Sequence, residues 1–118
     1  MGVELTARNV RDVLLVEISG RLTVLDPTLR DSLIHFLKTG YRRFILKMTE
    51  ISYIDSCGLG ELISAYVSIR QLGGEMRLLA PSTRTRKLLH MTKLDTVFEI
   101  IEDSTPFEDT TTSKVMSI

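Results

Sequence analysis

The sequence predicts an α/β fold: a single domain over residues 1–118, with a mixed, mostly parallel five-stranded sheet and about four helices. Two observations lead to this prediction. Apolar runs of strand length alternate with helical patterns along most of the chain, and strands joined by helical crossovers lie parallel. In addition, 118 residues, of which 43% are hydrophobic, are enough for one core and leave no room for a second domain.

The chain begins with a predicted antiparallel hairpin. Residues 3–8 alternate apolar and polar side chains, which is the period of a strand with one face in water. Residues 13–18 are nearly all apolar, as is typical of a strand covered on both faces. Because only the short polar segment 9–12 separates the two runs, they pair as a hairpin, and we expect the first strand to be an edge.

The first helix is predicted from its two ends. Asp26 is a good N-cap and Pro27 suits the first helical position, while Gly40 lies where a C-terminal cap belongs. The apolar side chains between them share one helical face: Leu29, Leu33, Phe36 and Leu37. These signals predict a helix of about three turns.

A strand-to-helix corner follows in the middle of the chain. Residues 44–48 form an apolar, β-favouring run, and a helical pattern then continues to Gly73 and Gly74, a strong stop. The apolar residues of that helix recur at intervals of three and four: Leu59, Leu62, Ile63, Tyr66 and Ile69. Residues 55–58, which are all small or polar, directly precede the first apolar residue of that helix.

Two more strands and two more helices are predicted in the C-terminal part. The strands are residues 76–80 and 97–101, and between them lies a third helix capped by Ser82 or Thr83. Residues 105–108 fit a capping box that would begin a short fourth helix. We expect the last several residues to be frayed unless three apolar side chains dock: Val115, Met116 and Ile118.

The corner carries the residues that most resemble a functional site. Asp55 or Ser56 can cap the second helix by accepting from its free amides. Gly58 and Gly60 each cost about 1 kcal/mol relative to alanine in a helix interior, so something else must favour them. The physical reasons would be close packing of the helix on the sheet or close approach by another molecule. An acid, a hydroxyl and glycines at a helix N-terminus therefore predict a site.

Composition excludes several classes of function. Fifteen basic residues balance fifteen acidic ones, so no global field favours nucleic acid, and a partner must be recognised locally. A single cysteine and two histidines rule out an internal disulfide and disfavour structural zinc; we expect neither metal nor cofactor. The N-terminus lacks a secretory pattern and no stretch is apolar enough to insert into a membrane, so we expect a cytoplasmic protein.

The order of elements and the run Tyr53-Ile54-Asp55-Ser56-Cys57-Gly58-Leu59-Gly60 resemble the STAS domain family of sulfate transporter domains and anti-sigma factor antagonists. The resemblance extends from end to end of the chain. Its signature is a hydrophobic pair, Asp, Ser, one variable residue and Gly-Leu. A match of that signature, placed between the middle strand and the second helix of this topology, is much more specific than the short motif alone.

The resemblance implies a phospho-switch in a bacterial partner-switching pathway. An unphosphorylated antagonist binds an anti-sigma factor that has kinase activity, and phosphorylation of a hydroxyl just after the signature aspartate releases it until a phosphatase restores the hydroxyl. Here that phosphoacceptor would be Ser56. The docking surface implied is the surrounding loop and helix: Asp55, Cys57, Gly58, Leu59, Gly60 and Thr23. The domain would be no enzyme itself, and a monomer or weak dimer.

The sequence departs from the family pattern at three positions. Thr23 replaces an acidic residue that many antagonists have after the second strand, Lys47 replaces a frequent aspartate of the middle strand, and Cys57 a frequent second hydroxyl. Two other hypotheses therefore remain open. One is a constitutive, non-phosphorylated STAS subunit of a transport or signalling complex, in which Ser56 is only a helix cap. The other is an enzyme that uses Cys57 as its nucleophile.

Two further features have plain structural readings. Cys57 is interpreted as a small buried residue rather than a reactive thiol, since no second cysteine supplies a redox pair. Arg84, Arg86 and Lys87 form a small basic cluster at the start of the third helix. Such a cluster is most often a solvated face, although it can receive a phosphate or an acidic partner.

Overall fold

The computed structural model describes residues 3–23, 28–102 and 115–117. Their α-helices are α1 (Thr28–Lys38), α2 (Ser56–Gln71) and α3 (Thr83–Met91), and a 3-10 turn, η1, spans Leu94–Thr96. The strands are β1 (Val3–Val10), β2 (Val13–Leu22), β3 (Arg43–Ile54), β4 (Glu75–Leu79), β5 (Ile100–Ile101) and β6 (Val115–Ser117). None of the helices in these residues is long and apolar enough to cross a membrane.

The strands form one mixed sheet in the order β5-β4-β3-β2-β1-β6. β2, β3, β4 and β5 are mutually parallel, whereas β1 is antiparallel to both of its neighbours. The two-residue turn between β1 and β2 has left-handed backbone at Arg11 and Asp12, with φ of 51° and 69°, which matches the twist of a tight hairpin. The predicted mixed, mostly parallel α/β sheet is confirmed.

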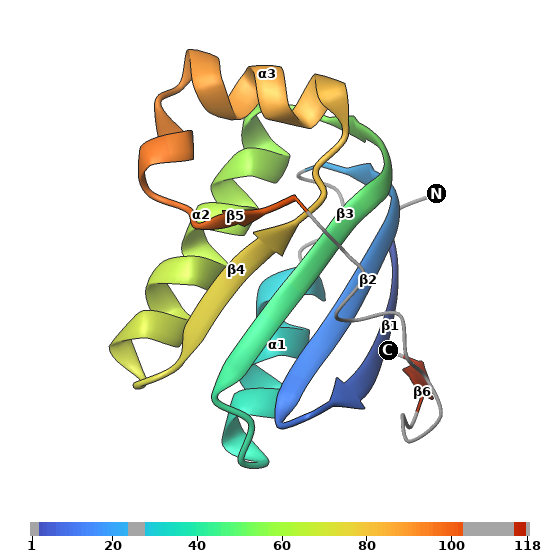
Figure 1. Ribbon diagram of the computed structural model, residues 1–118, viewed down its shortest axis with the longest axis vertical. Coiled ribbons are helices and arrows are strands. Elements are labelled where there is room, and N and C mark those ends of the chain that lie inside the picture. The colour runs from blue at the N-terminus through green and yellow to red at the C-terminus, as the bar shows by residue number, and fades with distance from the viewer. Residues whose placement is uncertain (1–2, 24–27, 103–114, 118) are drawn as a thin grey trace.

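The core lies between the sheet and the helix pair α1 and α2, which cover one face side by side (Figure 1). Alternate residues of the central strands point into it, as the period of a strand requires: Leu14, Val16 and Ile18 of β2, and Phe44, Leu46 and Met48 of β3. A smaller cluster occupies the other face: Val10, Leu15, Ile45 and Leu79. The central strands are thus buried on both faces.

The glycines predicted to follow the C-terminal ends of α1 and α2 have the expected backbone. Gly40 and Gly73 have φ of 118° and 88°, the left-handed backbone that ends a helix readily. Asp26 and Pro27, predicted as the start of α1, lie outside the described residues. Ser82, rather than Thr83, caps α3, and its hydroxyl accepts from the Thr85 amide.

Four details differ from the sequence prediction. The described residues hold three α-helices instead of about four, and the fourth, placed at residues 105–108, lies outside them. The sheet has a sixth strand, β6, which pairs with β1, so β1 is not an edge strand. The predicted last strand, residues 97–101, is reduced to β5, because Lys93 turns the chain with φ of 60° and the 3-10 turn follows.

The C-terminal ends of β2, β3 and β4 all lie at the same end of the molecule. Figure 1 shows that the N-terminus of α2 begins there and that α3 crosses the same end. This arrangement brings together three segments that are far apart in the sequence: the end of β2, the corner after β3 and the start of α3. The predicted site lies within this group.

Candidate functional site

Asp55 is the residue that starts α2. Its backbone is extended (φ −115°, ψ −175°), its side-chain Oδ1 accepts from the Gly58 amide at 2.8 Å, and its carbonyl accepts from the Leu59 amide at 2.8 Å. Of the two residues predicted to cap the helix, Asp55 therefore supplies the N-cap, and Ser56 is the first helical residue. The carboxylate also lies at the positive end of the helix dipole, where an acidic side chain stabilises the helix.

Gly58 is required because α2 begins in contact with the end of β2. A Cβ placed on Gly58 would lie 1.9 Å from the Leu22 carbonyl oxygen and 2.6 Å from its carbon. Backbone cannot yield to such a contact as a flexible side chain would. The first of the two reasons considered for the glycines, close packing of helix on sheet, thus applies to Gly58.

Gly60 has a different environment. It is exposed, and a Cβ built on it would meet nothing within 4 Å. The fold therefore gives no packing reason for a residue that weakens the helix. A smooth, exposed patch of backbone is what remains, and it is open to contact by another molecule.

Ser56 and Cys57 both face solvent on the first turn of α2. The Ser56 hydroxyl has no hydrogen-bond partner among the residues that the structure describes, because Asp55 already provides the side-chain cap. The interpretation of Cys57 as a buried residue is wrong: its thiol is free and exposed. The helix buries Gly58, Leu59 and Leu62, and Cys57 lies off that face.

The other residues considered for the site lie at different distances from the corner. Thr23 is half-buried and directly follows Leu22, so it lies at the same edge as the corner. Leu59 is only 4% exposed and belongs to the core, where it can position the turn but offers little to a partner. Lys47 is half-buried in the middle of β3, roughly 26 Å along the strand from Asp55 at about 3.3 Å per residue. The Lys47 departure thus does not alter the corner.

One residue pair beside the corner was missed from sequence. The Arg21 guanidinium stacks over the Tyr53 ring at 4.5 Å from its centroid, and the two residues are register partners in the parallel pair of β2 and β3. Arg21 therefore places a positive charge two residues before Thr23. No sequence signal pairs Arg21 with Tyr53, because the register of β2 and β3 shifts between Glu17 and Ser19 and again between Gly20 and Arg21.

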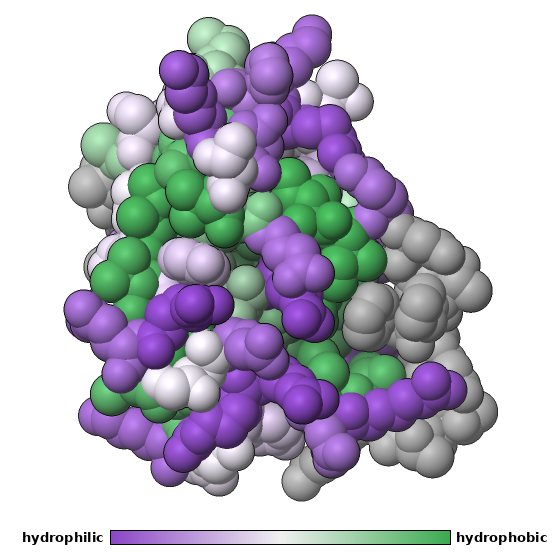
Figure 2. All heavy atoms as spheres, turned by 60° about the vertical axis from the view of Figure 1, so that its left-hand side comes forward, coloured by the Kyte–Doolittle hydropathy of each residue, from purple (hydrophilic) through white to green (hydrophobic). Residues whose placement is uncertain are grey.

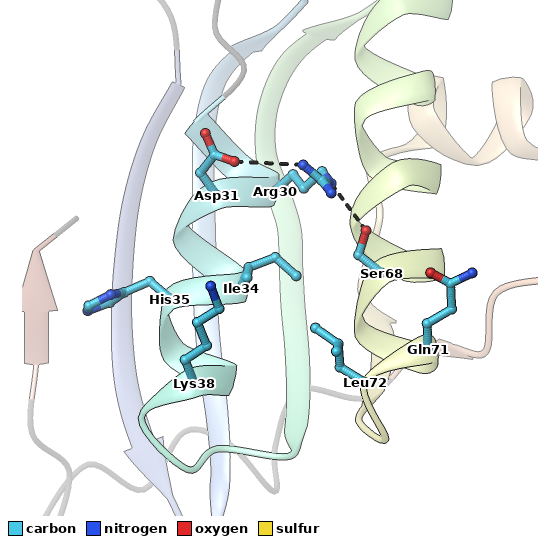
Figure 3. A pocket seen from close by; sticks show the side chains of 8 residues that line it. All are labelled: Arg30, Asp31, Ile34, His35, Lys38, Ser68, Gln71 and Leu72. Atoms are coloured by element: carbon cyan, nitrogen blue, oxygen red, sulfur yellow. Dashed lines mark hydrogen bonds and ion pairs between the residues drawn. The ribbon is translucent and has the colours of Figure 1, made fainter.

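A hollow lies on the helical face, away from the corner. It measures about 670 Å³ between α1 and α2. Figure 3 shows Arg30 reaching from α1 toward Ser68 of α2, to which its Nε donates at 3.1 Å, and Asp31 beside it at 3.9 Å. Arg30 and Ser68 are already used to join the two helices, and Asp31 pairs with Arg30, so the corner remains the better candidate.

Comparison with known proteins finds one matching family model and several relatives. Residues 4–110 match the family model described as STAS domain. A Thermotoga neapolitana protein, provisionally assigned as an anti-sigma factor antagonist, is 31% identical over 67 residues, 57% of this chain and 59% of its own. The chain therefore spans only about 59% of the length of that relative. The anti-sigma-B factor antagonist of Bacillus subtilis is 28% identical over 85% of this chain and 92% of its own.

Solved structures share the fold. The crystal structure of a Thermotoga maritima protein with the same provisional assignment has a TM-score of 0.75 at 26% identity, covering 84% of this chain and 86% of that one. The Bacillus cell fate determinant SpoIIAA in its phosphorylated form has a TM-score of 0.64 at 18% identity, covering 91% and 97%. The second likeness concerns the fold alone.

Proposed function

The chain belongs to the STAS domain family, and on that premise we propose that it is an anti-sigma factor antagonist, the role named for its Bacillus subtilis relative. In this proposal it binds an anti-sigma factor with kinase activity, phosphorylation of Ser56 releases that partner, and a phosphatase resets the switch. The observation that carries the proposal is the Ser56 hydroxyl: it is exposed and, within the described residues, has no hydrogen-bond partner.

The cap explains why Ser56 can be modified without loss of the fold. Asp55 supplies the side-chain acceptor for the first turn of α2, so a phosphate on Ser56 would remove no contact made by the described residues. The added charge of about −1.5 to −2 would lie at the positive end of the helix dipole, where anions are favoured. The effect of phosphorylation should therefore fall on a partner rather than on the domain.

The partner would contact the exposed part of the corner: Ser56, Cys57 and Gly60, with Thr23 and Asp55 at its border. Gly60 contributes an approach to bare backbone that any Cβ would obstruct. Gly58 and Leu59 hold the turn in place from below. A phosphate in the centre of this contact would be an unpaired charge that the partner must desolvate, which costs several kcal/mol of binding free energy.

The test is a pull-down from a lysate of the cells that encode the chain. Wild type, Ser56→Ala and Ser56→Asp serve as baits, and Gln71→Glu, at the far end of α2, controls for added negative charge on an exposed site of the same helix. Mass spectrometry identifies the bound proteins and any phosphate on Ser56. Capture of an anti-sigma factor with a kinase domain by every bait except Ser56→Asp is the expected result.

Other outcomes would point away from the switch. Equal capture of one non-kinase assembly by all four baits, with Ser56 never phosphorylated, would support a constitutive STAS subunit instead. Adding Cys57→Ala to the set tests the enzyme alternative, because an exposed thiol can be removed without leaving a cavity. Under our proposal this variant is still phosphorylated on Ser56, because the switch does not need the thiol, whereas an enzyme that uses Cys57 as its nucleophile would lose its activity.

A further inference from the structure

The outer face of α3 combines apolar and basic side chains that the phospho-switch does not use. At helical spacing, one stripe of this face consists of Arg84, Lys87, Leu88 and Met91, which we call the α3 stripe. Met91 is 78% exposed, the highest value for any large apolar side chain among the described residues. A methionine held out in water at the end of such a stripe suggests a contact surface, because its flexible thioether adapts to varied partners.

Hollows border the α3 stripe on both sides. One, of about 500 Å³, reaches from Lys87 and Met91 to Ile54, the last residue of β3. The other, of about 640 Å³, reaches from the same two residues to Ile100 of β5. Figure 2 shows apolar side chains gathered on the face that carries β5, below a hydrophilic rim. Met91 and Lys87 thus form a ridge between two partly apolar depressions.

The charges of the α3 stripe lack counter-ions in the part of the chain that the structure describes. Arg84 and Lys87 make no ion pair there, and α3 itself contains no acidic residue. Their neighbour Arg86 differs, since its guanidinium donates to both Glu102 oxygens at 2.7 and 2.6 Å. The stripe therefore offers two cations without counter-ions in these residues next to partly apolar hollows, a pattern complementary to carboxylates that flank apolar side chains. Asp95, which also lines the hollow toward Ile100, is already bonded to His90 at 2.9 Å.

We propose that the α3 stripe is a second docking surface, which takes an acidic amphipathic segment of a partner protein. Its carboxylates pair with Arg84 and Lys87, while its apolar residues fill the hollows beside Met91. Nucleic acid is a poorer match, because two cations in a chain with no net charge neutralise few phosphates. This surface is separate from the Ser56 hydroxyl and so goes beyond the function proposed above.

The experiment follows backbone amide signals of the isotope-labelled full chain by NMR. The probe is a synthetic helical peptide with glutamate on one face and leucine on the other, compared with the same peptide carrying lysine for glutamate. The acidic peptide should shift the amides of residues 83–91 and of Ile54 in a saturable, salt-sensitive way. Lys87→Glu and Met91→Ala should each weaken that binding roughly tenfold, through charge repulsion and lost apolar contact respectively.

Matched controls come from the groove between α1 and α2. Lys38→Glu makes the same charge reversal as Lys87→Glu, and Leu72→Ala truncates a large exposed apolar side chain as Met91→Ala does. Both positions line that groove, and both variants should leave peptide binding unchanged. Ser56→Ala should also bind the peptide as wild type does. The peptide titration therefore tests the α3 stripe separately from the pull-down, which tests Ser56. Three results would overturn the proposal. The acidic peptide would cause no saturable shifts at α3, the lysine peptide would bind equally well, or the groove variants would lose as much affinity for the acidic peptide as the α3 variants do.

Discussion

Gly58 and Gly60 are two residues apart in one helix, yet the structure gives them opposite constraints. Gly58 touches the Leu22 backbone, whereas Gly60 faces open space. The sequence could predict that both glycines cost helix stability, but it could not assign the reason to each. That assignment depends on how close α2 lies to β2, which no local pattern encodes.

We predict that alanine substitution separates the two glycines. Gly58→Ala should destabilise the fold by at least about 1–3 kcal/mol, the usual cost of overpacking, because the carbonyl it meets is backbone. Gly60→Ala should stabilise the fold by up to about 1 kcal/mol through helix propensity, while weakening partner binding. Urea unfolding gives the free energies. A tolerated Gly58→Ala would mean that α2 does not start against β2 as described.

A charge at Ser56 is predicted to help the domain itself. Ser56→Asp adds an anion at the first position of α2 and should raise the free energy of unfolding by about 0.3–1 kcal/mol at low ionic strength. Asp55→Ala should lower it by about 1 kcal/mol, because it removes the acceptor for the Gly58 amide. Thermal unfolding at low and high salt measures both. A Ser56→Asp variant that is less stable than wild type would argue that phosphorylation acts by unfolding.

The burial of Cys57 was predicted wrongly because the residue was judged by its type alone. Its small size and apolar character suggested burial, but the same periodicity that identified Leu59 and Leu62 as buried places Cys57 off their helical face. The helical period, continued back to the first turn, would have given the right answer. Lys47 is a similar case, since its effect on the corner could be judged only from its place along β3.

At the scale of elements, periodicity predicted the strands and helices wherever both flanks carried clear signals. It failed where a distant segment or a local turn decided the outcome. Residues 97–101 favour a strand, yet the left-handed Lys93 and the 3-10 turn redirect the chain, and Phe98 instead packs on the Tyr66 ring at 5.0 Å. β6 pairs with β1 from the other end of the sequence, which no local pattern reveals.

Loss of β6 is predicted to expose one edge of the sheet without unfolding it. A chain ending at residue 114 lacks the pairing of Thr6, Ala7 and Arg8 with residues 115–117. Hydrogen exchange of the β1 amides that face β6 should become faster, whereas exchange in β2 and β3, which keep both neighbours, should not change. Unchanged exchange along β1 would contradict the pairing.

The ion pair between α3 and the end of β5 should make stability depend on pH. Hydrogen bonding and the charge of Arg86 hold the pKa of Glu102 below its ordinary value of 4.5. Because the folded-state pKa is depressed, the pair contributes stability above the unfolded-state pKa, and this contribution is lost as the pH falls through the folded-state pKa. The effect should be small, since the pair is exposed.

Comparison of urea unfolding at about pH 7 and about pH 3 would detect this contribution. Wild type should lose more stability on acidification than Glu102→Gln does. Glu50→Gln is the control, because Glu50 is exposed and makes no ion pair within the described part of the chain. Equal acid sensitivity of wild type and Glu102→Gln would show that the pair does not form in solution.

At the scale of the whole molecule, the corner and the α3 stripe lie at the same end of the sheet, and the helices that carry them pack into one core. α2 is fixed by its buried stripe against the core, and α3 by Thr85 and Leu89, which are 1% and 0% exposed. A change of charge at Ser56 requires no rearrangement of the described residues, because Ser56 is exposed and its hydroxyl makes no hydrogen bond to them. We expect wild type and phosphorylated chain to share one fold and to differ in what they bind.

The most direct test of this account is the affinity of a purified anti-sigma factor kinase, identified by the pull-down, for the chain with and without phosphate on Ser56. Isothermal titration calorimetry should show a loss of roughly 30-fold or more on phosphorylation, because an unpaired charge buried at an interface costs about 2–5 kcal/mol. Gln71→Glu should bind as unmodified wild type does. Equal affinities for the phosphorylated and unphosphorylated chain would contradict the proposal that Ser56 is the switch.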